Sequence, residues 1–554
     1  MKSLIIKRPG GDVEFIKKAI LSKRKSYKSE EIHARRWWIL AVLCLALMIV
    51  MIDNTVLNVA LPTLSRELKA SSSHLQWMVD AYSLIFAGLL FTMGAIGDRY
   101  GRKGILQVGL VVFGLTSAYT AFMADSAIAV IVARGVMGLS AAMIMPATLS
   151  ILTNVFPPKE RAKAVGIWAG VVGVGVAIGP VLGGYLLNHF SWHSVFTINI
   201  PIVIVCLLVA GMLVPRTADP SHANIDLFGG VLSTVGLVAL VYAIIEAPHN
   251  GWLSGETLLV AAVSVVILSV FIWWQLRAEH PMLDVRLFKN RSFGISSLTL
   301  GLVFFAMFGI FFSFSLFLQL IRGYSPLDSA IRMLPIAGVL AFAAPMSTVL
   351  TKKFGKRKIV SGGLLTVALG VFILSTVGIA SSYMHLVAGM VTMALGMGLA
   401  MSPTTDLLMS SVPKARAGMG SAMNDTAREL GGALGVAVLG SLLASQYASK
   451  ISGSLSNLPD TVRDTAEKSL AGALAMGQQI GGATGSQVVT AAQNAWMSGF
   501  HRSLLIGVVI IASAAVVAFW GLPDVADDHH VHQVGGFEDG KEDKKSSKKL
   551  IAKA

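Results

Sequence analysis

Three ionisable residues stand inside long apolar stretches of the chain. Asp53 lies in "AVLCLALMIVMIDNTVLNVALP" (41–62), Asp80 in "LQWMVDAYSL" and Arg134 in "ARGVMGLSAAMIMP". A charge at the centre of a membrane helix costs about 2.5 to 3.5 kcal/mol, so such groups normally face a wet cavity or one another. Because a helix rises about 1.5 Å per residue, all three fall at similar depth, and we expect them to meet.

An acid and a base buried together could handle a proton. Our hypothesis is that Asp53 takes up and releases a proton, and that Arg134 keeps the carboxylate charged until the two side chains separate. Asn54 and Asn58 would be hydrogen-bonding neighbours of this site. The alternative interpretation is a fixed structural ion pair that exchanges no proton.

A second charged group lies in "SAMNDTARELGGALG". Asp425 and Glu429 are four residues apart and share one face of a predicted helix, with Arg428 close enough to pair locally. They either handle protons or cations directly or form a structural group near the cytoplasmic side. Asp406, in "MSPTTDLLMSSVP", is either a cavity acid or a charge at a helix end beside basic residues.

The composition predicts that these residues are positioned by membrane-spanning helices. The chain has 554 residues, 54% hydrophobic and 14% charged, with a mean hydropathy of +0.69. This balance is typical of an integral membrane protein. About 20 apolar residues cross the hydrocarbon as a helix. That length predicts an all-α integral membrane fold with fourteen spans, near 38–61, 76–97, 104–124, 128–153, 164–187, 194–214, 227–247, 256–276, 293–320, 328–350, 359–379, 384–411, 420–446 and 501–522.

The net charge of +15 follows topology rather than a binding face. Most of the 45 Lys and Arg residues fall on one side of the predicted membrane, in the N-terminal segment, the C-terminal tail and the loops between. The positive-inside rule then places both termini in the cytoplasm and the chain in the cell membrane. We therefore expect an anionic lipid surface, and no nucleic acid, as the partner of this charge.

Two features predict a duplicated core with an insert. "GAIGDRYGRKGIL" (94–106) and "STVLTKKFGKRKIV" (347–360) match weakly around Gly101 and Gly355, eight spans apart, and two glycine-rich spans show the same offset. Six helices, two inserted helices and six more would give this pattern. The predicted organisation is a basic N-terminal segment 1–37, a six-helix bundle 38–214, an insert 215–292, a second bundle 293–522 with an outer connection 447–500, and a polar tail 523–554.

Five motifs together carry a family resemblance. "GAIGDRYGRKG" resembles the signature loop of the major facilitator superfamily, and "DNTVLNVALP", "LQWMVDAYSL", "ARGVMGLSAAMIMP" and "GVGVAIGPVLGG" resemble further motifs of its fourteen-helix drug:proton antiporter branch. The resemblance implies an exporter of amphiphilic, cationic compounds, driven by protons and working by alternating access. The sequence has no Walker loop and no metal-ligand spacing of histidines, so we expect no enzyme activity and no cofactor. Leu340 and Asn424 stand where relatives carry further acids, so divalent cations fit the pattern less well.

The resemblance also assigns roles to two motifs. The signature loop would be a conformational latch that locks the inner gate; its residues are Gly94, Asp98, Arg99, Gly101, Arg102 and Lys103. The alternative is a solvated turn. The glycine motif is associated with exporters and allows close helix approach, although it is also explained by simple packing; its residues are Gly175, Gly179, Pro180, Gly183 and Gly184.

Further side chains are predicted to line a substrate pocket. Aromatic faces bind cations and bulky planar molecules. The expected substrate-binding residues are Asn54, Asn58, Trp77, Tyr82, Phe308, Phe312 and Asp406. The tail residues His529, His530 and His532 could bind a metal, but a solvated tail is the simpler interpretation, and we expect no metal site. A narrow-substrate exporter of a lipid, amino acid or natural antibiotic, or a channel or sensor with the same fold, remain the alternatives. We expect a monomer.

Overall fold

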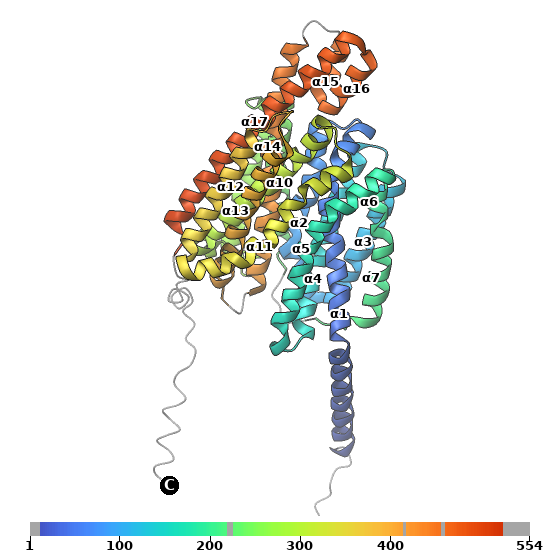
Figure 1. Ribbon diagram of the computed structural model, residues 1–554. Helices are drawn as coiled ribbons and strands as arrows, with labels where there is room; N and C mark the ends of the chain where they lie inside the picture. Colours follow the sequence, from blue (N-terminus) through green and yellow to red (C-terminus); the bar gives the residue numbers. More distant parts are fainter. Residues whose placement is uncertain (1–10, 219–224, 414–416, 456–459, 524–554) are drawn as a thin grey trace, which may run out of the picture.

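The computed structural model describes residues 11–218, 225–413, 417–455 and 460–523. All regular elements in these ranges are helical, and fourteen of the helical segments are long and apolar enough to cross a membrane. The predicted all-α membrane fold and its number of spans are therefore confirmed (Figure 1). The tail histidines lie outside the described residues.

The first half of the chain forms one bundle. Its helices are α1 (Gly11–Glu67), α2 (Ser72–Tyr100), α3 (Arg102–Phe122), α4 (Ala127–Val155), α5 (Pro158–His189), α6 (Ser194–Thr197) and α7 (Asn199–Leu213). The short α6 and α7 together occupy the sixth predicted span. Helix α1 packs against α4, α5 and α7, so it lies at the centre of this bundle.

The second half forms a similar bundle. It contains α10 (Arg291–Leu316) with the π-helical turn η2 (Phe317–Ile321), then α11 (Pro326–Phe354), α12 (Lys356–Ser375), α13 (Tyr383–Ser410), α14 (Ala417–Ser454) and α17 (Gly482–Gly521). Its packing repeats that of the first bundle eight spans later. Helix α10 packs on α14 as α1 packs on α5, and α13 packs on α11 and α12 as α4 packs on α2 and α3.

The repeat extends to the backbone of one turn. Gly101 separates α2 from α3 with φ of 133°, and Gly355 separates α11 from α12 with φ of 86°. Side chains with a Cβ rarely adopt these angles, so glycine at both positions lets the chain reverse without strain. This is the pair of positions around which the two loop sequences match.

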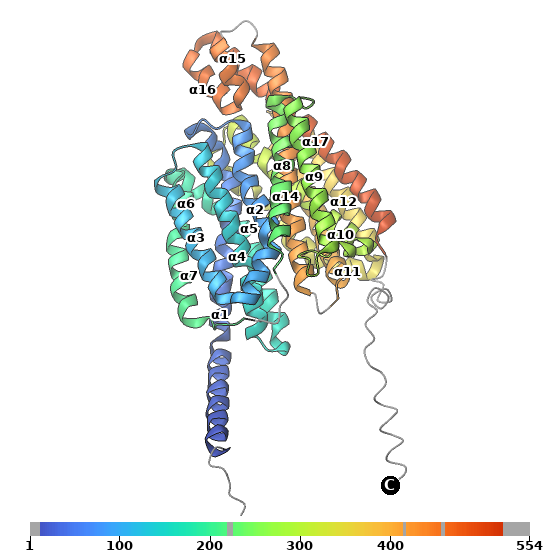
Figure 2. The ribbon, with the colours of Figure 1, turned by 180° about the vertical axis from the view of Figure 1, so that it is seen from behind.

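Two helices between the bundles form a hairpin, α8 (Leu227–Asn250) and α9 (Gly255–Arg277), followed by the 3₁₀ turn η1 (Val285–Lys289). Helix α8 contacts both α2 and α14, and α9 packs on α8 (Figure 2). Asp226 caps α8 by accepting from the Gly229 amide at 2.8 Å and also accepts from Trp274 Nε1 at 2.9 Å. The cap therefore ties the start of α8 to the end of α9.

Residues 447–500 include the connection between the last two candidate spans. Apart from the undescribed residues 456–459, they are largely helical: α14 continues to Ser454, α15 (Asp460–Lys468) and α16 (Leu470–Ile480) follow, and α17 begins at Gly482. The alanine content favours helix, and Ser469 caps α16 through the Gly472 amide at 3.0 Å. These helices stand beyond the two bundles, opposite the end where α1 begins and α17 ends (Figure 1).

Candidate functional site

Asp53 and Arg134 form an ion pair in the interior of the first bundle. Asp53 is 2% exposed and Arg134 is fully buried. Nη1 of Arg134 donates to Oδ2 of Asp53. The guanidinium also donates through Nε to the Met78 carbonyl at 3.0 Å and lies 4.3 Å above the centre of the Tyr82 ring. Helices α1, α2 and α4 therefore meet at this pair, as the sequence predicted for Asp53 and Arg134.

Asn199 is a member of the site that the sequence analysis missed. Its Nδ2 donates to Oδ1 of Asp53 at 3.0 Å and lies 3.3 Å from Oγ of Ser117. It is the first residue of α7, directly after the interruption that separates α6 from α7. A sequence signal was available, because Asn199 is a polar residue inside the apolar stretch "FTINIPIVIV", just as Asp53 is a polar residue inside an apolar stretch.

Asp80 does not join this pair, contrary to the expectation that the three charges meet. It lies two positions from both Met78 and Tyr82 on α2, and side chains two apart on a helix do not face the same neighbour. Its own face includes Gln76, whose Oε1 accepts from Ser441 of α14 at 3.0 Å. Asp80 is fully buried, and neither carboxyl oxygen has a hydrogen-bond partner among the described residues.

The second charged group lies on α14, but its expected local ion pair is absent among the described residues. Asp425 accepts from Asn424 Nδ2 at 3.3 Å. The guanidinium of Arg428 lies 5.2 Å from the centre of the Phe304 ring. Within the part of the chain that the structure describes, Arg428 Nε and Glu429 Oε2 have no hydrogen-bond partner. Glu429 faces Ser83 of α2 and is within electrostatic range of Arg134. All three α14 residues remain partly exposed, unlike Asp53.

Asn54 and Asn58 are buried on α1, next to the stretch of α1 that contacts the second bundle. Asn58 Nδ2 donates to the Asn54 carbonyl at 3.3 Å, and the side-chain oxygens of both have no partner in the described ranges of the chain. Ser315 donates to the Asn58 carbonyl at 2.6 Å, and Gln319 to the Val59 carbonyl at 2.9 Å. These bonds join α1 to α10 and η2 toward the α15–α16 end.

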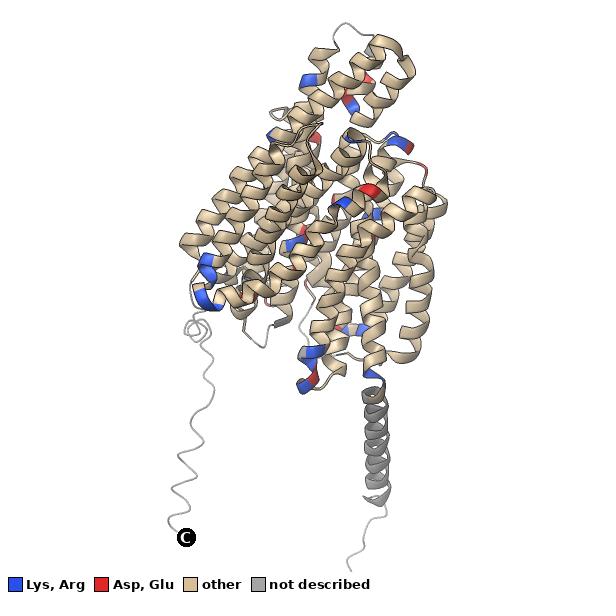
Figure 3. Cartoon of the chain, viewed as in Figure 1, with Lys and Arg blue, Asp and Glu red and all other residues tan. Residues whose placement is uncertain are grey.

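The bundles thus meet at one end and diverge at the other. The Gln76–Ser441 bond joins α2 and α14, and Gly184 of α5 lies directly against Pro326 and Leu327 of α11. Toward the end where α1 begins, the bundles spread apart (Figure 1). Figure 3 shows that most of the Lys, Arg, Asp and Glu residues lie toward the two ends of the bundles, with few between them. The described conformation is closed at the α15–α16 end.

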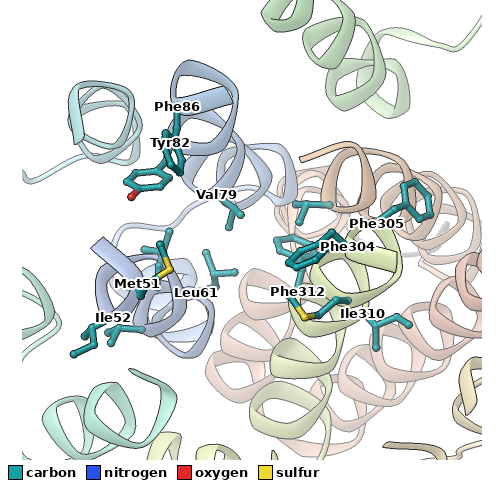
Figure 4. Packing of buried hydrophobic residues seen from close by; sticks show 14 of the residues in the cluster. Met51, Ile52, Leu61, Val79, Tyr82, Phe86, Phe304, Phe305, Ile310 and Phe312 are labelled. Atoms are coloured by element: carbon teal, nitrogen blue, oxygen red, sulfur yellow. The ribbon is translucent and has the colours of Figure 1, made fainter. Parts of the chain in front are cut away.

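The predicted aromatic residues separate into different environments. Trp77 donates to Glu246 Oε1 of α8 at 3.2 Å, so it packs on the inserted hairpin. Phe312 is buried beside the closed end, whereas Phe308 is partly exposed and stacks on Phe304 with a centroid distance of 6.1 Å. Figure 4 shows Phe304 and Phe312 on α10, across from Val79 on α2. Phe304, next to Arg428, was not among the predicted site residues.

The glycine motif of α5 allows this helix to pack directly against α1. A Cβ on Gly175 would lie 2.7 Å from Met51, one on Gly179 would lie 1.9 Å from Thr55 Oγ1, and one on Gly183 would lie 2.7 Å from Val56. Pro180 lies inside the helix beside them. The stripe permits a backbone approach that larger residues would prevent. It therefore fixes the stretch of α1 that carries Asp53.

The signature loop has polar contacts within the first bundle. Oδ1 of Asp98 accepts from Arg102 Nε at 2.7 Å and from Ser150 Oγ at 2.6 Å, and Lys103 donates to the Gly211 carbonyl at 2.7 Å. The tip of the loop is the positive-φ Gly101, and a Cβ on Gly94 would lie 3.4 Å from Pro146 of α4.

Asp406 occupies the corresponding region of the second bundle. It is exposed and pairs with Lys356 at the start of α12, at 2.5 Å. This contact favours the interpretation of a charge at a helix end. The basic residues first considered as its neighbours, Lys414 and Arg416, lie outside the described residues.

We expect Asp98→Asn to slow transport about tenfold, because charge-assisted bonds of this kind contribute about 1.5 to 3 kcal/mol. The measurement is the efflux rate at equal amounts of protein in the membrane. Asp125→Asn is the matched control, since Asp125 is an exposed acid between α3 and α4, and it should leave the rate unchanged. A wild-type rate for Asp98→Asn would show that the loop is a solvated turn.

Fourteen candidate spans in the described ranges, with packing that repeats between two bundles, form the kind of architecture from which many membrane transporters are built. The chain belongs to the Major Facilitator Superfamily, whose family model matches residues 43–436. This is a family of transporters and not of enzymes.

Individual proteins give the same result. The chain is 36% identical to the "Multidrug efflux pump LfrA" of Mycolicibacterium smegmatis, over 87% of this chain and 95% of the relative. It is 35% identical to the "Methyl viologen resistance protein SmvA" of Salmonella typhimurium, over 73% of this chain and 82% of the relative. Its fold matches a crystal structure of a bacterial homologue of the lysosomal transporter Spinster, with a TM-score of 0.60 at 20% identity, covering 88% of this chain and 97% of that one.

Proposed function

We propose that this protein is a multidrug exporter that exchanges amphiphilic, cationic compounds for protons. The relatives named as a multidrug efflux pump and a methyl viologen resistance protein support the substrate class. The observation that carries proton coupling is the sealed Asp53–Arg134 pair, an acid on α1 and a base on α4 that are buried against each other inside the membrane. A purely structural role would not require ionisable groups at this position, because apolar residues of similar size pack there at lower cost.

The distribution of charge supports the orientation. Lys and Arg residues concentrate in the segments and loops at the end where α1 begins and α17 ends. This supports the proposal that this end lies in the cytoplasm and the protein in the cell membrane. The described conformation, closed at the α15–α16 end, is then the one that receives substrate from the cytoplasm. We propose that a monomer carries out the whole cycle with no cofactor other than the proton.

The proposed cycle uses this chain's own side chains. While Arg134 and Asn199 both donate to Asp53, the carboxylate is stabilised as the charged form. A proton on Asp53 would remove the attraction and free the guanidinium, so protonation and movement of α1 against α4 are linked. Asp80 is a second proton-carrying candidate, because burying an unpartnered carboxylate costs far more than burying the neutral acid. It shares a face of α2 with Gln76, whose side chain bonds to Ser441 of α14 in the other bundle.

The proton gradient supplies sufficient free energy for this exchange. One charge crossing the membrane potential contributes about 2.3 kcal/mol per 100 mV. A pH difference adds about 1.4 kcal/mol per unit. When one proton exchanges for one monovalent cation the charges cancel, so the pH difference alone drives the exchange and supports about a tenfold substrate gradient per unit. The membrane potential contributes only when more protons enter than positive charges leave with the substrate.

Purified protein in liposomes tests the proposal. An imposed pH gradient should drive ethidium against its concentration gradient, and an uncoupler should abolish the accumulation. A panel of unrelated dyes distinguishes a multidrug exporter from a narrow one, because a narrow exporter would move at most one of them. Downhill flow alone, indifferent to pH, would contradict proton coupling and favour a channel.

A further inference from the structure

Arg428 has an aromatic partner but no anionic one among the described residues. Its guanidinium lies 5.2 Å from the centre of the Phe304 ring, and Phe304 in turn stacks on Phe308 with an interplanar angle of 28°. Nε of Arg428 is buried and has no hydrogen-bond partner in the described parts of the chain. This contrasts with Arg134, which donates to both a carboxylate and a carbonyl.

The acids nearest to Arg428 do not satisfy it. Asp425 and Glu429 interact with Arg428 electrostatically, but no ion pair with either is formed in the described regions of the chain. Asp425 bonds instead to Asn424, and Glu429 Oε2 is itself unpartnered there. A buried donor and a buried acceptor, each left unsatisfied within one turn, cost free energy unless something else pairs with them.

The position of the group makes it accessible to a ligand. Asp425, Arg428 and Glu429 are all partly exposed, whereas the Asp53–Arg134 pair is sealed. They lie on α14 where it packs against α10 and faces α2, between the two bundles. A guanidinium stacked on a ring keeps the N–H groups along its edge free for a planar acceptor.

We propose that Arg428 and Phe304 form a subsite for an electron-rich oxygen of the cargo, a carboxylate, phenolate or quinone carbonyl on a planar ring. Arg428 donates to that oxygen while the ring of the ligand packs beside Phe304 and Phe308, and Glu429 accepts from an ammonium group of the same molecule. The cargo class therefore extends beyond simple cations to zwitterionic aromatic compounds. This inference rests on the proposed export function.

Two substrates transported by the same protein test the subsite. Proton-driven uptake into liposomes is measured for ethidium, a cation without an acidic oxygen, and for norfloxacin, an aromatic zwitterion with a carboxylate. We expect Arg428→Gln to reduce norfloxacin transport at least about tenfold, the usual effect of losing a charge-assisted bond, and to change ethidium transport less than about twofold. Arg428→Lys should also lose norfloxacin, since an ammonium neither stacks nor presents a planar fork.

The outcomes separate this inference from the export function. Arg502→Gln is the control for loss of a positive charge, because Arg502 is exposed and donates at 2.7 Å to Gln446, which lies far along α14 from Arg428. Equal loss of both substrates in Arg428→Gln, or unchanged transport of both, would overturn the subsite. Wild-type protein that moved ethidium but not norfloxacin would also overturn it while leaving proton-driven export intact. Wild-type protein that moved neither would contradict export itself.

Discussion

Asp53→Asn is expected to abolish proton-driven transport, with a loss of at least about a hundredfold in rate. Asparagine keeps the shape and can still accept a hydrogen bond, but it neither binds a proton nor neutralises Arg134. The charge of Arg134, fully buried, then has no counter-ion. Removing one partner of a buried pair costs about 3 to 5 kcal/mol, so the variant should also melt at a lower temperature.

A double variant separates these two effects. Asp53→Asn combined with Arg134→Gln contains no buried charge at this site, so thermal stability should return toward the wild-type value. Transport should remain lost, because the proton-binding group is still absent. The melting temperature in detergent and uptake into liposomes are measured on the same preparations. Recovery of proton-driven transport in the double variant would mean that the pair is only structural.

Gly179→Ala is expected to have the second largest effect. The added Cβ would lie 1.9 Å from Thr55 Oγ1, 3.0 Å from Thr55 Cβ and 3.3 Å from the Ile52 carbonyl oxygen, so α1 or its side chains must shift. Overpacking of this kind costs about 1 to 3 kcal/mol and should displace α1 two residues from Asp53. We expect at least about a tenfold loss of transport, measured as dye efflux at equal protein levels.

Gly173→Ala is the matched control, because a Cβ at Gly173 on the same helix meets nothing within 4 Å. It should leave transport unchanged. Thr55→Ala should partly restore transport in Gly179→Ala, because it removes the hydroxyl that clashes with the added methyl group. The difference between the effect of the double variant and the sum of the two single effects measures the interaction between positions 55 and 179. Normal transport in Gly179→Ala would show that α1 and α5 need not approach this closely.

The fold was predictable from the sequence because hydrocarbon imposes a simple rule on length and polarity. Fourteen apolar runs became fourteen candidate spans, and a weak loop repeat around Gly101 and Gly355 corresponds to two equivalent turns. The connection 447–500 was less predictable. Its small and polar residues form no long apolar run. The prediction of helices used such runs, so it could not locate the alanine-rich helices in this connection.

The site was predictable only to a degree. A charge in an apolar run signals function, and this identified Asp53, Asp80 and Arg134, but depth along a helix does not specify the direction of a side chain. Asp80 therefore lies on the face of α2 that carries Gln76 and does not join Arg134. Arg428 lies over the Phe304 ring and forms no ion pair with its sequence neighbours among the described residues. Asn199 was missed because an uncharged amide in a span is common and its partner is 146 positions away.

Proton movement coupled to substrate movement is the decisive measurement. Liposomes containing a trapped pH indicator and purified protein receive a substrate gradient with no imposed pH difference, and proton flux is recorded as the substrate moves. We predict proton flux opposite in direction to the substrate for the wild type, and none for Asp53→Asn even though the variant still binds ethidium. Substrate movement without proton flux in the wild type, or equal proton flux in Asp53→Asn, would contradict exchange at Asp53.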